Sequence, residues 1–392
     1  MNTKYMFFIT GLLLAVLFSC SEKKLEPITD SMGKPGTVSI IAKEELPGGV
    51  RLKYKIPNTE DILAVKAVYT LSNGRTYEES ASFYENKITI LGFNDVNEHS
   101  VNLYAVSYAQ VYSDPVEVKF TPLEPPLAKI ARSVSIISDF GGAQYRWENE
   151  DKYPVNLEFF TPDSTGVLQL VRIITSELPA ANLSLRGYKP DPRTFAVVVR
   201  DNYGNMTDTL KENIIPMFEE RFNKRSMSVM KLGDDANFTN WEGMDAYLID
   251  DDKTTFGHSP ANSLPASFTI DMGVTGQVSR IVMFNRLFND SYYSWGNPKD
   301  IKIYGKKDRP SQNGSWDEWG EPIIVGQLSK PSGLPSGTDT DEDKAYAEAG
   351  FEFVFPLDVE PLRYIRVVIL STQTGPTYTH PAEVDIFGEV KN

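Results

Sequence analysis

Short stretches in which charged and apolar residues alternate constrain the fold of this chain most strongly. Residues Arg51–Ile56 read Arg-Leu-Lys-Tyr-Lys-Ile, and Val116–Phe120 repeat the same alternation. A period of two residues predicts β-strands with one face in solvent and the other in a hydrophobic core. The chain has one cysteine in 392 residues, so no intramolecular disulfide can hold it together and each domain must bury its own core. The pattern predicts an all-β protein.

The spacing of strands and turns predicts three successive β domains. About seven short strands in residues 35–122 predict a small sandwich, and a proline-rich stretch at 121–126 separates it from a second sandwich over 127–212. Charges at helical spacing in Ile214–Lys224 predict a short helix within a linker over 213–226. A third β domain is predicted over 227–392. The strands predicted for the second sandwich are Ser133–Ile137, Val155–Phe160, Leu168–Ile174 and Thr194–Arg200.

The N-terminal segment has the layout of a secretion signal. Lys4 precedes an apolar run from Met6 to Phe18, which is shorter than the roughly 20 residues that span a bilayer. Cys20 directly follows this segment, and the arrangement resembles a bacterial lipoprotein signal. The resemblance implies that residues 1–19 are removed, that Cys20 is acylated, and that 20–34 form a polar tether. It also implies an outer-membrane lipoprotein facing the cell exterior; the alternative is a secreted protein with a chance cysteine.

Charge and motif content exclude several classes of function. Asp and Glu outnumber Lys and Arg by 53 to 39, which argues against nucleic acid and against electrostatic docking on anionic lipid. The sequence contains no GxSxG, HExxH or phosphate-binding glycine motif. Glycoside hydrolysis needs two neighbouring carboxylates around a bound substrate, and small linked sandwiches rarely enclose a substrate deeply. The sequence therefore predicts a protein that is not an enzyme.

The third domain carries a series of family-like motifs. Together they resemble factor V/VIII type C (discoidin-like) domains, with Asp251 and Gly257 standing where that family has glycine and tryptophan. The resemblance implies an eight-stranded jelly-roll sandwich. The matching segments, in order, are Leu248–His258, Ser267–Gly273, Ser279–Arg286, Asp300–Gly305, Arg363–Val368 and Ala382–Gly388.

The first two domains resemble the modules of Bacteroidetes surface lipoproteins. The first is similar to their fibronectin-III-like N-terminal module, and the second to their middle module. Such proteins belong to starch-utilisation-type systems, so the resemblance implies a surface lipoprotein that binds polysaccharide or oligosaccharide beside an outer-membrane transporter complex. The segments that carry it are Pro35–Val38, Leu46–Val50, Asp61–Ala67, Leu91–Phe93, Asp139–Ala143 and Trp147–Asn149.

The acidic turn Asp250–Asp252 is a candidate metal site through the same resemblance. Related discoidin-like modules hold a structural calcium ion there, and hard oxygen ligands suit Ca²⁺. Carried over to this sequence, the ligands are Asp252, Thr255 and Glu383, with the carbonyl of Tyr247 as a further candidate. The alternative is a solvated acidic turn without metal.

Aromatic residues in the third domain are candidates for sugar binding. A sugar ring lies against an aromatic face while its hydroxyls need polar partners, so a site requires exposed rings beside polar side chains. Residues Leu287–Asn297 concentrate such rings, although a tryptophan there can also simply cover the end of the sandwich. The candidates are Trp295, Tyr292, Tyr293, Arg286, His258, Tyr378 and His380. Of the other tryptophans, Trp316 and Trp319 are expected to pack locally, Trp147 to lie in a core, and Trp241 is left open.

Two functions are consistent with these sequence features. The first is glycan capture by the third domain, with the two preceding sandwiches as a stalk. The second is a structural or adhesion role, in which the domains contact a transporter or another surface protein. Exposed aromatic rings beside polar side chains favour the first, whereas a wide apolar patch with a polar rim favours the second.

Overall fold

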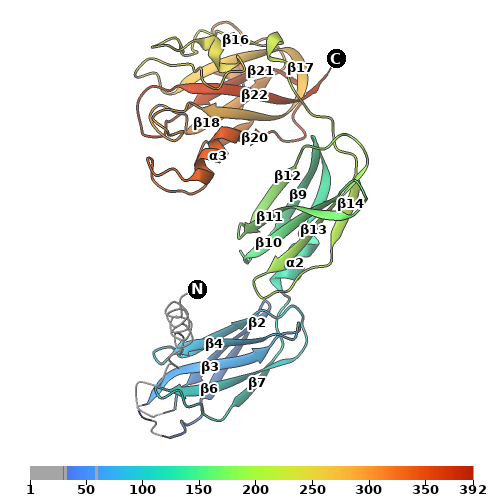
Figure 1. The fold of residues 1–392 in the computed structure, drawn as a ribbon, viewed down its shortest axis with the longest axis vertical. Helices are drawn as coiled ribbons and strands as arrows, with labels where there is room; N and C mark the ends of the chain where they lie inside the picture. Colours follow the sequence, from blue (N-terminus) through green and yellow to red (C-terminus); the bar gives the residue numbers. More distant parts are fainter. Residues whose placement is uncertain (1–29, 31–32, 58–60, 392) are drawn as a thin grey trace, which may run out of the picture.

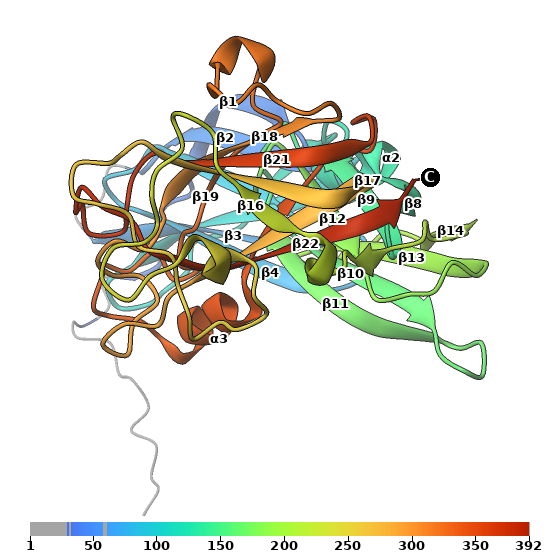
Figure 2. The same cartoon turned by 90° about the horizontal axis from the view of Figure 1, so that it is seen from above.

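The predicted all-β architecture is confirmed. The computed structural model describes residues 30, 33–57 and 61–391, so the signal segment, Cys20 and most of the tether lie outside the described residues. Three β domains follow one another along the longest axis of the molecule (Figure 1). Viewed down that axis, they lie over one another (Figure 2). Among the described residues, no helix is both long and apolar enough to cross a lipid bilayer.

The first domain is a sandwich of two antiparallel sheets. A three-stranded sheet, β1-β2-β5, packs on a four-stranded sheet, β4-β3-β6-β7. The alternation in β2 buries Val50, Leu52 and Tyr54 in the core between them and leaves the intervening basic residues outside. The strands are β1 (Ser39–Leu46), β2 (Gly49–Lys55), β3 (Ile62–Thr70), β4 (Thr76–Ser82), β5 (Lys87–Leu91), β6 (His99–Ser107) and β7 (Val116–Phe120).

The second domain repeats this arrangement with an added helix. Sheet β12-β9-β8 faces sheet β11-β10-β13-β14, and Trp147 lies in the core as expected. Helix α2 (Pro126–Ser133) was not predicted; it begins at a proline and buries Leu127 and Ile130 against the sandwich. The strands are β8 (Ser135–Asp139), β9 (Gly142–Glu148), β10 (Val155–Pro162), β11 (Leu168–Ser176), β12 (Ala180–Leu185), β13 (Arg193–Asp201) and β14 (Leu210–Ile214).

The predicted linker helix over Ile214–Lys224 is wrong. The segment is extended, and the main chain of Met217 bonds to Asp139 and Gly141 of the second domain at 2.9 and 2.8 Å. It then forms the short strand β15 (Glu220–Arg221) beside β22, followed by one 3₁₀ turn, η1 (Lys224–Ser226). Pairing with sheets on both sides satisfies the backbone groups that a helix would have bonded internally, so the helical spacing of the charges does not decide the structure.

The third domain is built around one 20-residue strand, β17 (Ala266–Asn285). Its first half pairs with β16 and β21, and its second half with β20 and β22. The halves join near Gly273, whose φ of +72° and close approach to the carbonyl of Ser226 leave no room for a side chain. The other elements are β16 (Ser228–Met230), η2 (Asp245–Leu248), β18 (Asp300–Lys306), η3 (Trp316–Glu318), β19 (Ile324–Gln327), α3 (Asp341–Ala349), β20 (Phe351–Val354), β21 (Leu362–Ile369) and β22 (Pro381–Val390).

The first and second domains are joined by a polar and aromatic contact. The ring of Tyr203 packs edge-on against that of Tyr77, with centroids 5.6 Å apart. The carbonyl of Tyr203 accepts hydrogen bonds from Tyr77 Oη at 2.8 Å and Asn73 Nδ2 at 3.1 Å. The buried side chain of Asn205 donates to the Gly92 carbonyl at 2.8 Å. These contacts fix the angle between the two sandwiches.

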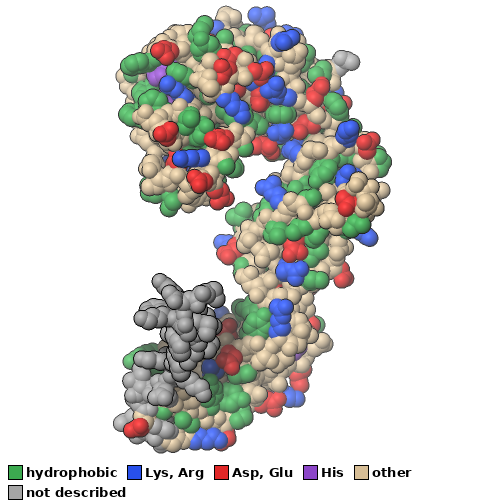
Figure 3. All heavy atoms as spheres, in the orientation of Figure 1, with side chains coloured by type: hydrophobic (Ala, Val, Ile, Leu, Met, Phe, Trp, Pro, Cys, Tyr) green, Lys and Arg blue, Asp and Glu red, His purple; other side chains and the backbone are tan. Residues whose placement is uncertain are grey.

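The second and third domains are joined by ion pairs around Glu219 of the linker. Its carboxylate accepts hydrogen bonds from Arg280 Nε at 3.1 Å and Ser279 Oγ at 2.6 Å, both in β17. Arg186 of the second domain pairs with the same carboxylate at 3.4 Å, and with Glu352 of β20 at 3.6 Å. Figure 3 shows the resulting outline, which is concave on one side of the middle domain. The third domain is thus held at the end of the molecule by contacts at both junctions.

Candidate functional site

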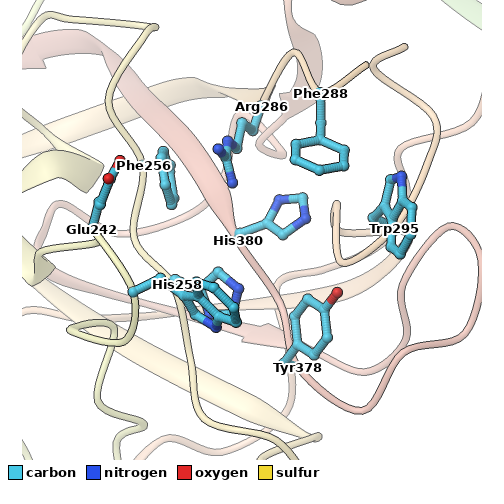
Figure 4. Close-up of a pocket in the computed structure, with 9 residues that line it drawn as sticks. Glu242, Phe256, His258, Arg286, Phe288, Trp295, Tyr378 and His380 are labelled. Carbon is cyan, nitrogen blue, oxygen red and sulfur yellow. The ribbon is translucent and has the colours of Figure 1, made fainter. Parts of the chain in front are cut away.

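The candidate site is a cavity of about 360 Å³ at one end of the third domain. Its walls come from the segment before η2, the loop between η2 and β17, the loop after β17, and the loop before β22. Figure 4 shows these side chains converging from separate loops. The lining residues are Trp241, Glu242, Phe256, His258, Arg286, Phe288, Trp295, Tyr378 and His380.

Two tryptophans expose their rings at this cavity. Trp241 is 86% exposed and Trp295 is 45% exposed. Both have left-handed backbones, with φ of 55° and 54°, a conformation that bulky residues rarely adopt. Such strain persists where the surrounding structure enforces it, and it concentrates at binding sites. The backbone on the C-terminal side of Trp295 is held because the Gly296 N–H donates to His380 Nε2 at 3.1 Å.

Arg286 supplies hydrogen-bond donors without a partner. Its guanidinium stacks on the ring of Phe256 at 3.5 Å from the centroid and lies 5.0 Å from that of Phe288 (Figure 4). Burial lowers the pKa of this guanidinium, although the charge of Glu242 opposes the effect. Within the described residues no carboxylate lies at salt-bridge distance from it, and none of its N–H groups is hydrogen-bonded. Its N–H donors are therefore available to a ligand.

The two histidines of the cavity are buried and neutral. His258 Nδ1 donates to the Ser259 carbonyl at 2.8 Å, which leaves Nε2 as an acceptor. Its ring stacks on Tyr378, with centroids 4.8 Å apart. Burial lowers the pKa of His258, and it lowers that of His380 to about 3. Neither histidine is charged near neutral pH, so the cation of this site is Arg286.

The neutral His380 predicts a loss of stability in mild acid. In the unfolded chain the imidazole has the ordinary pKa of 6.5, whereas in the folded protein the pKa of His380 is about 3. The contribution of neutral His380 to the free energy of unfolding is therefore fully present above pH 6.5. It falls as the pH decreases, by about 2 kcal/mol at pH 5. Urea unfolding at pH 7 and pH 5 measures this difference. In His380→Gln most of it should disappear; an equal difference in that variant would contradict the assignment.

The structure separates the sequence candidates into two groups. Trp295, Arg286, His258, Tyr378 and His380 line the cavity together. Tyr292 and Tyr293, in the same loop as Trp295, do not line it, because their side chains turn into the domain.

The two tyrosines that leave the cavity pack elsewhere. Tyr293 is fully buried and donates its hydroxyl to the Asp343 carbonyl at 2.9 Å. Tyr292 is half-buried against the core. Neither side chain lines the cavity, so neither can contact a glycan bound there.

Four lining residues were not among the sequence candidates. Trp241, for which the sequence allows either role, and Glu242 lie a few residues before the acidic turn. Phe256 and Phe288 lie beside predicted residues in the two loops that contribute most to the site. Proximity to a motif was the available signal for all four, but apolar rings in loops are more often packing residues than ligand contacts.

The acidic turn brings together a partly different set of oxygens from those expected. The carboxylate that accepts from Thr255 Oγ1 is that of Asp250, at 3.0 and 3.1 Å, while Asp252 Oδ1 accepts from Thr254 instead. Thr255 Oγ1 also contacts the main-chain carbonyl of Asp252 at 2.8 Å. Asp252 thus contributes a carbonyl to this cluster, and Asp250 takes the place expected for the carboxylate of Asp252.

Glu383 lies close to this turn and is only partly neutralised. Its Oε1 lies 2.9 Å from Lys224 Nζ, and its buried Oε2 has no partner. Burial raises the pKa of Glu383, with Asp250 adding to that increase and Lys224 opposing it. An unpartnered carboxylate oxygen is a hard ligand of the kind that Ca²⁺ takes. The described residues contain no cluster of three or more His, Cys, Asp or Glu side chains suited to a metal, so calcium would depend on threonine and carbonyl ligands.

The chain matches known families in three consecutive segments. Residues 35–122, 123–225 and 247–388 each match a different family model, and each of these families is described as a domain of unknown function. No curated protein matches the chain.

Solved structures give further similarities. A SusE-like protein is 28% identical, with 68% of this chain and 100% of that chain covered and a TM-score of 0.44. The C-terminal domain of a chitobiase from Bacteroides fragilis is 20% identical, covering 44% and 100%, with a TM-score of 0.32. A CBM32 domain from Clostridium perfringens, in complex with GlcNAc-α-1,4-galactose, is 13% identical, covering 43% and 95%, with a TM-score of 0.27. The three family models thus coincide in order with the three β domains described above.

Proposed function

We propose that this protein is a non-catalytic cell-surface lipoprotein that binds polysaccharide through the cavity of its third domain. The observation that carries the proposal is the unpartnered guanidinium of Arg286 beside the exposed rings of Trp241 and Trp295. The guanidinium is half-buried against two aromatic rings, so a ligand can take its N–H donors without displacing a protein partner. Sugars offer both the C–H faces that pack on indoles and the hydroxyls that bond to a guanidinium.

The cavity offers complementary partners for the hydroxyls of a sugar. Arg286 can donate to a hydroxyl oxygen, while the Glu242 carboxylate and His258 Nε2 can accept from hydroxyl protons. Neighbouring hydroxyls on one ring can engage donor and acceptor groups simultaneously, which fixes the orientation of the sugar. A neutral sugar, rather than an acidic one, fits a site in which Glu242 accompanies the cation.

The same set of residues supports binding rather than hydrolysis. Glycosidases place two carboxyl groups on either side of the scissile bond, about 5 to 9.5 Å apart. Among the residues lining this cavity, Glu242 is the one carboxylate. The proposed role is therefore capture of a glycan for uptake by other proteins.

Anchoring through Cys20 would complete this function at the outer membrane. A lipid-linked binder is concentrated at the surface, and a long glycan that engages several copies gains avidity without a tighter single site. The contacts at both domain junctions support a stalk that holds the cavity away from the anchor. An adjacent outer-membrane transporter complex is the proposed recipient of the glycan.

Affinity electrophoresis tests the proposal. The soluble Cys20→Ser protein is run through gels containing different neutral polysaccharides, and at least one should retard it. Trp295→Ala should be retarded clearly less in that gel, while Tyr84→Ala, which removes an exposed ring in the first domain, should migrate like the parent. Free migration of the parent protein in every gel of a broad panel would reject the proposal.

One observation favours a second function, contact with another protein. Strand β11 is an edge strand of the second domain, and it exposes Leu168, Leu170, Val171 and Ile173. An exposed apolar edge can pair with a strand of another protein. Under this proposal the transporter complex docks here, and Leu170→Lys combined with Ile173→Lys should abolish its co-purification. Unchanged co-purification would exclude β11 as the contact.

We also propose that the acidic turn binds a structural calcium ion, with Asp250, Thr255 and Glu383 as side-chain ligands. The unpartnered Oε2 of Glu383 supports this assignment. Calcium bound at 100 times its Kd would stabilise the folded domain by about 2.7 kcal/mol. Calcium should therefore raise the melting temperature of the parent and of Asp252→Ala, and should not raise that of Asp250→Ala. If calcium leaves the melting temperature of the parent protein unchanged, the proposal is wrong.

A further inference from the structure

A second hollow surface lies away from the loop cavity, on the outer face of the sheet formed by β17, β21, β18 and β19. Ser267, Val368, Lys302 and Val325 lie opposite one another in a single row across these four strands. Paired residues of adjacent strands point to the same face, so these four side chains all lie on the side of the sheet away from the core. Two hollows of about 410 and 340 Å³ lie on it and share Leu370.

Trp316 forms an aromatic platform beside this row. Its indole is 41% exposed and lines the larger hollow. The Arg366 guanidinium lies 3.8 Å from the ring centroid, and the Tyr304 ring lies 5.5 Å away. Arg366 is fully buried and donates to Asp235 Oδ1 at 3.0 Å and to the Gly314 carbonyl at 3.1 Å. A ring held in this way is pre-organised, so little entropy is lost when a ligand stacks on it.

Polar side chains line the larger hollow beside the platform. Lys302 lines the hollow, and its ammonium group forms no hydrogen bond or ion pair with any described residue. Asp234 also lines it, and its partly exposed carboxylate, which accepts from Arg366, has further lone pairs for a ligand. At the second hollow, Asp300 and Gln327 are joined by a hydrogen bond of 2.5 Å. Lysine is depleted in the cores of protein interfaces, so a free lysine in the middle of this face favours a glycan over a protein.

We propose that this face is a second glycan-binding site, which takes an internal segment of a linear polysaccharide across Trp316. The inference rests on the proposed function of the loop cavity. The two sites differ in form, because adjoining hollows along a sheet accommodate a chain that continues in both directions. A polysaccharide bound at both sites of one domain, or of neighbouring molecules, gains avidity that a short sugar cannot gain.

Binding measurements with long and short forms of one glycan test the inference. The polysaccharide that retards the parent protein is compared with its terminal mono- or disaccharide, by affinity electrophoresis and calorimetry. Trp316→Ala should weaken binding of the polysaccharide about tenfold or more and leave binding of the short sugar unchanged. Arg286→Ala should weaken binding of the short sugar by roughly 10- to 100-fold and leave residual retardation by the polysaccharide. Adding Trp316→Ala to Arg286→Ala should remove the retardation that remains.

A second variant guards against an effect on folding. Lys302→Ala should also weaken polysaccharide binding, whereas Lys307→Ala removes an exposed lysine beyond the same strand and should not. If Trp316→Ala and Lys302→Ala both bind the polysaccharide as the parent does, the second site is rejected and a protein becomes the candidate occupant of this face. A parent that binds no glycan rejects the proposed function itself, which is a distinct outcome.

Discussion

Replacing Arg366 with methionine is expected to lower the free energy of unfolding of the third domain by about 3–5 kcal/mol. The guanidinium is fully buried and donates to Asp235, to Ser267 Oγ at 3.3 Å and to the carbonyl of Gly314. Methionine fills similar space but leaves the carboxylate of Asp235, itself 1% exposed, as a buried charge without its partner. The loss is large because that charge remains, rather than because the ion pair is strong by itself.

A neighbouring arginine provides the matched control. Arg363 lies in the same strand and bonds to both oxygens of Asp271, at 2.9 and 3.1 Å, but its side chain is 40% exposed. Arg363→Met should cost about 1 kcal/mol or less. Urea unfolding followed by tryptophan fluorescence measures both variants, because every tryptophan except Trp147 lies in the third domain. Equal losses in the two variants would contradict the role given to burial.

Replacing Arg286 with alanine is expected to weaken glycan binding by roughly 10- to 100-fold. Hydrogen bonds to a charged group contribute about 1.5–3 kcal/mol, and each 1.4 kcal/mol is about tenfold in Kd. Arg286→Lys should lose most of this affinity too, because an ammonium keeps the charge but neither the planar fork of donors nor the stacking on Phe256. Calorimetry with the glycan that the parent protein binds measures the Kd of both variants.

The control for this prediction is another cation that packs on an aromatic ring. Lys253 Nζ lies 3.7 Å from the ring centroid of Phe284, outside the residues that line the cavity. Lys253→Ala should leave the affinity unchanged. If Arg286→Lys binds as tightly as the parent, the guanidinium contributes only its charge, and the proposed hydrogen bonding to hydroxyls is wrong.

Strand positions were well predicted where side chains alternate between core and solvent. Residues Arg51–Ile56 and Val116–Phe120 correspond to β2 and β7, because alternation records burial on one face directly. In Ile214–Lys224 the helical spacing of charges was misleading. Those side chains are placed by backbone pairing with sheets of two domains, a tertiary effect that local spacing does not carry.

The loop site was only partly predictable, because loop sequence does not encode which way a ring turns. Tyr293 and Trp295 are two residues apart in the same polar loop, yet one is fully buried and the other is exposed at the cavity. The difference arises from the hydrogen bond of Tyr293 to the Asp343 carbonyl and from the left-handed backbone at Trp295. Similarly, the choice between Asp250 and Asp252 depends on the path of the turn, and both residues look equivalent in sequence.

The crystal structure of the protein with the shortest oligosaccharide that it binds would test glycan binding by the loop cavity most directly. We expect a sugar ring against Trp295 or Trp241, with a hydroxyl within hydrogen-bond distance of the Arg286 guanidinium. An oligosaccharide bound on the first or second domain, with the loop cavity containing only solvent, would contradict the account.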